Sequence, residues 1–461
     1  MSEQEKDTYS FKENSEREVE KFVGIQSYAT NKMGIIGGEY KRNLKDFVVR
    51  EIINNGKILD IKEDIKTHSF SEELKDRYTT FNLVKIYMDT FEAIKKISKK
   101  LKVPYDYFNY SGLKDKFSIS VQKISVKGDY VEELRNLKLK DIFIRNIFPT
   151  RKPVKLGSHR GNHFTIILRN IENSLNLKNK VEKYIKFLNE FGFPNYFGLQ
   201  RFGTYRPNSH IVGRYILEGK FKEAFEEFVS TTYSTESLES KNVRREFQNS
   251  RDFQKAYQSF PNNLKYEKNM IQYLIENPED YKGSIDTLHT DLKKLLVSSF
   301  QSYLFNRIIS LRLEKGFNLY KPIKGDVISI LDDYNGNITH VKYLFGEAYD
   351  KFLKKALELN RAAIIIPILG TNTNLDEFPV MKPLYEDILK QEKINMAIFN
   401  NNLNHEPEFK GSIRAMTTKP IMLKLLELND DELNPGKKKV KLEFSLQKGS
   451  YATMLIREFI K

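Results

Sequence analysis

The stretch Ser-Gly-Leu-Lys-Asp-Lys-Phe-Ser-Ile-Ser-Val-Gln occupies residues 111–122, where a glycine-containing loop runs into an alternating strand. The loop presents one carboxylate, Asp115, between Lys114 and Lys116. On these residues alone a solvated turn is the simpler interpretation, because glycine and charged side chains are common in turns. Asp115 is still the best candidate for covalent chemistry, since the chain has no cysteine and no serine in a nucleophile-elbow motif.

Composition bounds the class of protein. The 461 residues exceed what one hydrophobic core organises, so we expect two domains. The chain carries 76 Lys and Arg against 61 Asp and Glu, and its net charge of +15 suits a polyanionic partner such as nucleic acid. A general bias toward Lys and Asn, with no such partner, is the alternative. Aromatic rings are dense at 105–110 and interleave with basic residues at 196–206, and rings in such loops can stack on unpaired bases.

The sequence also indicates where the protein works and what it lacks. No apolar run approaches the roughly 18 residues of a membrane-spanning helix, and residues 1–24 form a charged segment without the apolar core of a signal peptide. We therefore expect a cytoplasmic protein with no membrane partner. His159 and His163 have the spacing of a metal-ligand pair, but Gly161 argues against a helix there and no third ligand is nearby, so we expect no metal.

Hydrophobic patterns predict strands and helices in the first part of the chain. Asp89 and Glu92 resemble a capping box and predict the start of a helix that Pro104 ends. A second helix is predicted over 177–191, with Gly192 as its stop. Strands are predicted at 45–53, 81–88 and 164–169.

The strand that follows Asp115 changes parity. Ile119 and Val121 fall on one face of a strand, whereas Ile124 and Val126 fall on the other. Because side chains alternate along a strand, this pattern predicts a bulge or break between the two pairs, beside the Asp115 loop.

From about residue 196 the patterns become mostly helical, and after Arg414 they return to strands. Helices are predicted at 213–233, 263–278, 288–315 and 349–358, strands at 327–331, 363–367 and 439–446, and a short helix at the C-terminal end. We therefore predict a mixed α/β (α+β) fold, in which a helical domain interrupts a sheet domain. The predicted parts are a charged segment at 1–24, a sheet domain at 25–195 and 414–461, and an inserted domain at 196–413.

Six segments, taken in order, resemble one family, the TruD pseudouridine synthases, and in particular its archaeal members that act on tRNA. Each segment is a weak signal alone, but together they span nearly the whole chain in the same order. The segments are Gly37-Gly38 with Lys41 and Lys45-Asp-Phe-Val-Val-Arg-Glu51; Ser111-Gly-Leu-Lys-Asp-Lys116 with Gln122; Leu156-Gly-Ser-His-Arg-Gly-Asn-His-Phe164; Asn195-Tyr-Phe-Gly-Leu-Gln-Arg-Phe-Gly203; Gln301-Ser-Tyr-Leu-Phe-Asn-Arg307; and Gly449-Ser-Tyr-Ala-Thr-Met-Leu-Ile-Arg-Glu458.

The resemblance implies a pseudouridine-synthase catalytic domain, a mixed sheet of permuted connectivity, with a family-specific TRUD domain inserted into it. It implies that Asp115 is the catalytic residue. By the same correspondence, the target uridine is lined by Phe47, Asn162 and Tyr451, with Phe164 stacked near it and Lys41 at the edge. The family has Phe where this chain has Tyr451, and tyrosine keeps the ring face while adding a hydroxyl.

Without the resemblance, simpler interpretations hold for the same residues. Phe47 and Phe164 lie in predicted strands, where phenylalanine is usually a core residue. Asn162 follows a glycine and would be a turn residue.

The implied reaction sets requirements on the site. Converting uridine to pseudouridine breaks the N1–C1′ bond and joins C5 to C1′ without redox change, so no cofactor is expected. An ionised carboxylate near the sugar would act as nucleophile or assist deprotonation, and the sequence leaves both roles open. A basic side chain must keep it ionised when RNA excludes water. Lys114 and Lys116 are adjacent candidates, but neighbours in an extended loop point apart, so Lys41 or Arg457 is an equal candidate and the sequence leaves the partner of Asp115 open. The expected RNA contacts are Lys114, Lys116, Arg201 and Arg457.

Two rival functions are weighed against this one. A lysine nucleophile of nucleotidyl transfer would need Lys-x-Asp-Gly, but here Asp115 directly follows Lys114 and no glycine comes next. An inactive RNA-binding protein of the same fold would be signalled by loss of the carboxylate, which is present. We predict a monomeric tRNA pseudouridine synthase that modifies uridine 13 in the D arm, with another tRNA site or another RNA as the alternative.

Overall fold

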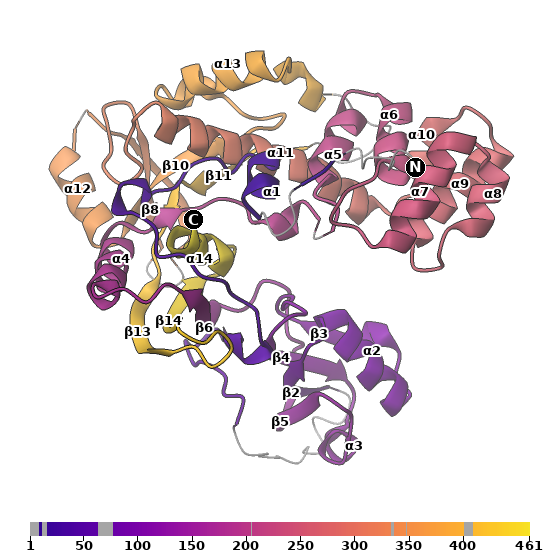
Figure 1. The fold of residues 1–461 in the computed structure, drawn as a ribbon, viewed down its shortest axis with the longest axis horizontal. Helices are drawn as coiled ribbons and strands as arrows, with labels where there is room; N and C mark the ends of the chain where they lie inside the picture. Colours follow the sequence, from indigo (N-terminus) through magenta and orange to yellow (C-terminus); the bar gives the residue numbers. More distant parts are fainter. Residues whose placement is uncertain are drawn as a thin grey trace. The chain divides into compact units, whose positions relative to one another are not determined.

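The structure is a computed structural model that describes residues 9–11, 16–62, 77–203, 205–332, 336–346, 348–400 and 409–461. Much of the charged segment expected at 1–24 therefore lies outside the described residues. The chain forms two compact units (Figure 1). Unit 1 comprises Met1–Ala29, Pro194–Asp332 and Ile338–Thr417, and unit 2 comprises Thr30–Phe193, Asp333–Asn337 and Thr418–Lys461.

The boundaries between these units fall close to positions 193/194 and 417/418, compared with the expected 195/196 and 413/414. Residues 25–29, which the sequence assigned to the sheet domain, group with unit 1. Two short strands, β7 (Phe193–Pro194) and β12 (Thr417–Thr418), fall at these boundaries.

Unit 2 is built on a mixed sheet, which confirms the predicted α/β fold class. The strands follow the order β13-β14-β6-β1-β4-β2-β5, with β3 paired to β4, and β1 runs parallel to β4 while its other neighbour, β6, is antiparallel. The strands are β1 (Phe47–Ile52), β2 (Tyr78–Ile86), β3 (Phe108–Tyr110), β4 (Ile119–Lys127), β5 (Ile142–Thr150), β6 (Gly161–Ile171), β13 (Ile421–Asp430) and β14 (Lys438–Gln447). The helices are α2 (Thr90–Leu101), α3 (Val131–Arg135), α4 (Leu177–Phe191) and α14 (Ala452–Ile460).

The bulge predicted beside the Asp115 loop is wrong. β4 is unbroken, and its register against β2 is regular along its whole length. Val121, Ile124 and Val126 are all fully buried, although they point to opposite faces. Val121 packs with Leu59 on one face, whereas Ile124 and Val126 join the core under α2 on the other. A strand covered on both faces has a continuous apolar pattern, so the change of parity carries no break.

Helices α2 and α4 begin where the sequence predicts, and α2 ends at Leu101, three residues before Pro104. The Asp89 side chain accepts a hydrogen bond from the Glu92 N–H at 2.8 Å and caps α2, which confirms this helix start. Ile94 and Ile97 bury one face of α2 against β2 and β4. Gly192 ends α4 with a φ of 78°, a left-handed conformation that favours glycine.

Unit 1 is mainly helical and holds a second sheet in the order β11-β10-β8-β9. Its strands are β8 (Val327–Leu331), β9 (Ile338–Leu344), β10 (Ala362–Ile368) and β11 (Ser412–Ala415). Its helices are α1 (Glu16–Phe22), α5 (Ser209–Leu217), α6 (Phe221–Phe225), α7 (Leu238–Ser250), α8 (Phe253–Ser259), α9 (Lys265–Glu276), α10 (Tyr281–Asp286), α11 (Thr290–Glu314), α12 (Asp350–Glu358) and α13 (Met381–Gln391). Gly219, with a φ of 69°, separates α5 from α6 inside the single helix predicted at 213–233. Among the described residues, no helix combines the length and apolarity needed to cross a membrane.

A buried charge cluster ties β6 to the turn after β13. Arg169 is 3% exposed, and its guanidinium contacts Asp46 at 2.9 Å, Asp431 at 2.7 Å and Glu432 at 3.1 Å. Burial opposes ionisation of Asp431, but hydrogen bonds, led by one from the Asn170 N–H, lower its pKa to about 2.

Replacing Arg169 by methionine should lower the free energy of unfolding by about 3–5 kcal/mol at pH 7, because buried carboxylates lose their counter-charge. The depressed pKa of Asp431 means that its stabilising contribution is present above about pH 4 and is lost as pH falls toward 2. The difference in the free energy of unfolding between the wild type and Arg169→Met should therefore shrink as the pH falls from about 4 toward 2. Urea titration checks both statements. Arg42→Met, which breaks an exposed pair with Glu39, is the control and should cost less than about 1 kcal/mol; equal losses in the two variants would contradict the cluster's role.

Candidate active site

Three of the expected site residues of unit 2 share one face of the central strands. Phe47 and Glu51 are four positions apart on β1, so they point to the same side. Antiparallel pairing places Asn162 opposite Glu51 and Phe164 opposite Val49 on β6, and directly paired residues also share a face. The fold therefore brings Phe47, Asn162 and Phe164 together.

Asp115 meets a lysine from another loop. The Nζ of Lys41 lies 3.2 Å from the Asp115 carboxylate, and about a quarter of each side chain is exposed. Lys41 adopts a φ of 59°, a left-handed conformation that is uncommon for residues other than glycine. Its Nζ also lies 4.4 Å from the centre of the Phe47 ring, within cation–π range. Lys41 was one of the candidate partners of Asp115, and the structure shows an ion pair between the two side chains.

A buried lysine holds the main chain of the Asp115 loop. Lys85 on β2 is fully buried, and its Nζ donates to the carbonyl oxygens of Met88 at 2.6 Å, Lys114 at 3.3 Å and Asp115 at 3.0 Å. Burial lowers the pKa of Lys85 to about 8, opposed chiefly by the negative charge of Asp115. The Ser118 hydroxyl donates to the same Asp115 oxygen at 2.7 Å. The backbone position of Asp115 is therefore fixed by the sheet beneath it.

Lys114, which the sequence assigned to RNA contact, is placed differently. Its side chain is 2% exposed, and its Nζ lies 2.8 Å from the Glu51 carboxylate, which also accepts a hydrogen bond from Ser111 at 2.6 Å. A buried ammonium paired in this way is not available to a phosphate. The pair instead joins the start of the loop to β1, and Lys114 leaves the set of expected RNA contacts.

Two further polar side chains fix the loop. The Thr90 hydroxyl accepts a hydrogen bond from the Lys114 N–H at 3.0 Å and donates to the Gln122 side chain at 2.9 Å. The Gln122 amide in turn donates to the Gly112 carbonyl at 3.1 Å. The first turn of α2, the loop and β4 are therefore one connected structure.

The aromatic side chains form a buried row. The rings of Phe47 and Phe164 meet edge to face with centroids 6.1 Å apart, and Phe164 stacks on Phe444 of β14 at 5.3 Å. Phe47 is 2% and Phe164 is 6% exposed, as core residues are. In contrast, the buried Oδ1 of Asn162 accepts no hydrogen bond from the described residues. An unsatisfied acceptor of this kind is costly unless a ligand or water supplies a donor.

The remaining expected residues lie as follows. Tyr451 is half-buried and directly precedes α14, four residues beyond the point where β14 pairs with Gly161. Lys116 is exposed and lies 3.9 Å from Glu92, so it stays a candidate for phosphate contact. Arg201 belongs to unit 1, where its guanidinium donates to the Ser302 hydroxyl at 3.2 Å. Arg457, expected to contact RNA, is 3% exposed, and its buried guanidinium is not available to a phosphate.

Lys85 and Thr90 were not among the site residues predicted from the sequence. The sequence did hold one signal for Lys85. The two residues before it, Leu83 and Val84, are apolar and point to opposite faces of the strand, so both faces are expected to be buried. A lysine in a strand buried on both faces needs buried acceptors. Thr90 carried no such signal, since its partners lie 24 and 32 positions away in sequence.

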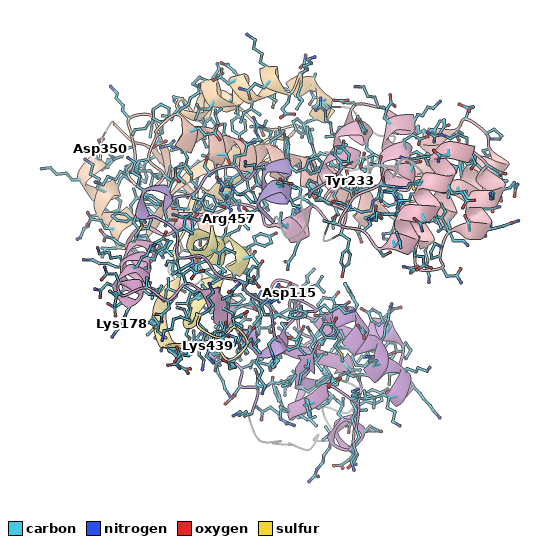
Figure 2. All side chains as sticks on the ribbon, viewed as in Figure 1. Asp115, Lys178, Tyr233, Asp350, Lys439 and Arg457 are labelled. Carbon is cyan, nitrogen blue, oxygen red and sulfur yellow. The ribbon has the colours of Figure 1, made fainter. Side chains whose placement is uncertain are left out.

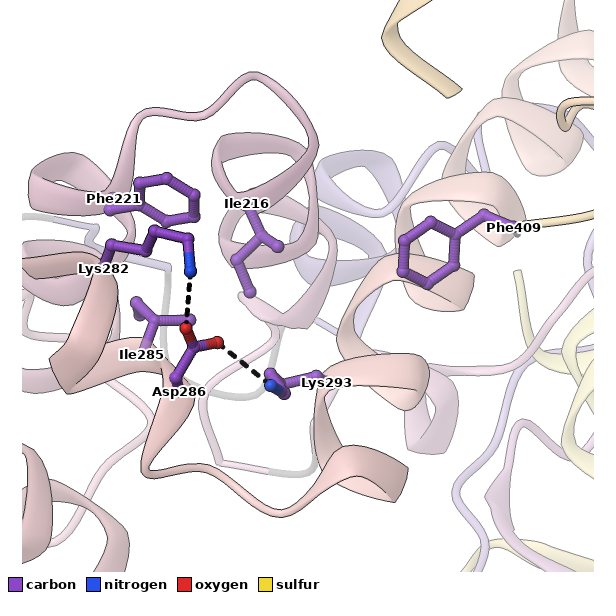
Figure 3. Close-up of a pocket in the computed structure, with 7 residues that line it drawn as sticks. All are labelled: Ile216, Phe221, Lys282, Ile285, Asp286, Lys293 and Phe409. Carbon is purple, nitrogen blue, oxygen red and sulfur yellow. Dashed lines mark hydrogen bonds and ion pairs between the residues drawn. The ribbon is translucent and has the colours of Figure 1, made fainter. Parts of the chain in front are cut away.

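A hollow in unit 1 is a weaker candidate for a substrate site. Figure 3 shows a hollow in unit 1 where Lys282 and Lys293 point at Asp286, with contacts of 2.8 Å and 3.1 Å. Its volume of about 10 Å³ leaves room for about one water molecule and for no substrate. Among the described residues, no three His, Cys, Asp or Glu side chains are placed to hold a metal ion.

Unit 2 carries a fixed loop with one partly exposed aspartate on a mixed sheet, and the segments of the helical unit interrupt its sequence. These features agree with comparisons to known proteins. The family model of tRNA pseudouridine synthase D (TruD) matches residues 22–459. A Methanosarcina mazei protein named "Probable tRNA pseudouridine synthase D" is 34% identical over 454 residues, which cover 96% of this chain and 98% of that protein. A Methanocaldococcus jannaschii protein named "Probable tRNA pseudouridine synthase D 1" is 30% identical, covering 95% and 99%.

A solved structure agrees with these sequence matches. A Methanosarcina mazei chain whose crystal structure is named "Putative tRNA pseudouridine synthase D (TruD)" superposes with a TM-score of 0.77 at 32% identity, covering 96% of this chain and 98% of that one. This fold and these matches define the class of protein: it is a pseudouridine synthase, and pseudouridine synthases are isomerases. Within that class, the chain belongs to the TruD family, which confirms the resemblance seen in its sequence.

Proposed function

We propose that this protein isomerises uridine to pseudouridine in tRNA, that Asp115 is its catalytic residue, and that its target is uridine 13 of the D arm. The observation that carries the proposal is the placement of Asp115. A partly exposed carboxylate stands beside Lys41 on a main chain that Lys85 and Ser118 hold in place. Preorganised groups of this kind are what a reaction at the sugar carbon requires.

In the proposed mechanism the N1–C1′ bond breaks, the uracil turns, and a C5–C1′ bond forms. The hydrogen on C5 leaves as a proton and N1 gains one, so atoms and electrons balance without a redox partner. Asp115 acts at the sugar as nucleophile or as base, and both roles need its ionised form. Lys41 stabilises that form electrostatically when RNA covers the site and excludes water.

The remaining residues of this face would hold the base. The Oδ1 of Asn162, which accepts no hydrogen bond from the described residues, can accept one from the imide N–H of uracil. Tyr451 offers a ring face to an unstacked base. Phe47 and Phe164 support the pocket from the buried side, where their rings pack edge to face against each other.

The target position is tested by mapping. Purified protein incubated with a tRNA transcript should form pseudouridine at position 13, and the same transcript with cytidine at that position should stay unmodified. Chemical mapping of the whole transcript locates the product. Modification confined to another position would contradict the choice of uridine 13, and no modification in any tRNA would contradict the proposed function.

A further inference from the structure

The exposed side of α2 and the adjoining residues Tyr87 and Lys116 carry rings and ammonium groups next to the Asp115 loop. We call the α2 face the six side chains Tyr87, Phe91, Lys95, Lys96, Lys99 and Lys116. Tyr87, which precedes α2, is 52% exposed, and Phe91 in its first turn is 42% exposed. On α2, Phe91, Lys95 and Lys99 follow one another at intervals of four residues, so they lie in one line along the helix.

The α2 face is continuous with the candidate active site. Lys116 directly follows Asp115, and its Nζ lies 5.7 Å from the centre of the Tyr87 ring. Tyr87 also meets Phe117 edge to face at 5.6 Å, and its N–H donates to the Ser118 carbonyl at 3.2 Å. Tyr87 and Lys116 are therefore the part of the α2 face that adjoins the Asp115 loop.

The face has a hollow and an excess of positive charge. A surface hollow of about 350 Å³ is lined by Asp89, Phe91, Glu92, Lys95, Lys96 and Lys99. Both acids are engaged locally, because Asp89 caps α2 and Glu92 pairs with Lys96 at 2.9 Å. What this face offers to a partner is a set of ammonium groups beside a hydrophobic ring.

We propose that the α2 face binds the unpaired nucleotides next to the target uridine, with bases stacked on Tyr87 and Phe91 and phosphates on the lysines. Stacking needs bases that are not paired, and ammonium groups favour a polyanion, so single-stranded RNA fits both features. The inference rests on the proposed function and adds to it the surface that receives the substrate. A solvated lysine-rich face and a surface for a protein partner are the two alternatives, and the test distinguishes both from RNA binding.

The test compares two double charge reversals within unit 2. Lys95→Glu with Lys99→Glu changes the α2 face, and Lys178→Glu with Lys183→Glu makes the same change of charge on α4. Figure 2 shows Lys178 well away from Asp115. Binding of a tRNA transcript is measured by fluorescence anisotropy from 50 to 200 mM salt. The α2 variant should raise Kd about 30-fold or more and flatten the salt dependence, since it removes two phosphate contacts, whereas the α4 variant should change Kd less than about 3-fold.

A second variant tests the stacking separately from the charge. Phe91→Ala should raise Kd about 10-fold while the slope of the salt dependence stays as in the wild type. Its helix is expected to remain folded because Phe91 is exposed, and circular dichroism checks this. If both α2 variants bind like the α4 control, the proposed surface is wrong and the face is solvated or serves another partner.

The outcomes also separate this inference from the proposed function. A wild-type protein that forms no pseudouridine but binds tRNA through the α2 face would refute the function and keep the surface. Normal modification and binding by the α2 variants would refute the surface and keep the function.

Discussion

Replacing Asp115 by asparagine should stop pseudouridine formation while leaving tRNA binding intact. The amide has nearly the same shape but can neither attack the sugar nor act as a base, so we expect the rate to fall by about 10⁴-fold. Binding should be unchanged or slightly tighter, because the variant removes one negative charge from a surface that receives RNA. Single-turnover assays and anisotropy on the same tRNA measure the two effects.

Asp106→Asn is the matched control for this variant. Asp106 is exposed, lies nine residues before Asp115, and undergoes the same chemical change. Its turnover should stay within about 3-fold of the wild type. Near-normal turnover in Asp115→Asn would show that another group performs the chemistry.

Replacing Lys85 by methionine should slow turnover about 100-fold at pH 7, although Lys85 does not touch the substrate. Its ammonium is a positioning group that binds the carbonyls of Lys114 and Asp115, and a catalytic group displaced by about 1 Å loses a factor of this size. The loss should appear in kcat rather than in KM, because the RNA-binding surface is unchanged. A melting curve distinguishes this effect from simple unfolding.

The pH dependence gives a sharper test of the same residue. Burial lowers the pKa of Lys85 from 10.5 to about 8, and the charged groups that face it are Asp115, Asp89, Lys114 and Glu92. Below pH 8 the amine is charged in the folded and the unfolded chain. Between pH 8 and 10.5 only the unfolded chain keeps that proton, so the contribution of Lys85 to stability rises with pH.

Activity should move in the opposite direction. Above pH 8 the neutral amine has one donor fewer for the three carbonyls it binds, so the loop loosens while the fold does not. The ratio of wild-type to Lys85→Met turnover should therefore shrink between pH 7 and pH 9. A ratio that stays constant over this range would mean that the charge of Lys85 does not position Asp115.

Local signals in the sequence were reliable where neighbouring residues decide the structure. The cap of α2 depends on Asp89 and Glu92, which are three positions apart, and the end of α4 depends on Gly192 alone. Both were predicted from these residues. The helix predicted at 213–233 failed at Gly219, where a left-handed glycine separates two helices that the apolar pattern had joined.

Burial by distant segments was beyond the same reasoning. Lys114 looks like a surface residue beside Asp115, but its partner Glu51 lies 63 positions away in sequence. The bulge expected in β4 was wrong for the same reason, since α2 and the segment around Leu59 cover its two faces. Sequence pattern reports the polarity of a residue, whereas its environment depends on contacts that only the fold brings together.

The candidate site was found through the resemblance rather than through the loop itself. Asp115 stands in a loop that reads as a turn, and its partner Lys41 lies 74 positions earlier. The flanking lysines, which sequence analysis assigned to phosphate, have separate roles in the fold. Lys114 forms a buried ion pair with Glu51, whereas Lys116 belongs to the exposed α2 face.

Release of tritium from C5 of uridine tests the central claim most directly. The wild-type protein, incubated with a tRNA transcript labelled with tritium at that carbon, should release label to water up to about one equivalent per tRNA, because the C5 hydrogen is lost when the new C5–C1′ bond forms. Asp115→Asn should bind the same tRNA and release none. Absence of release by the wild type from every tRNA, or equal release by the two proteins, would contradict the account.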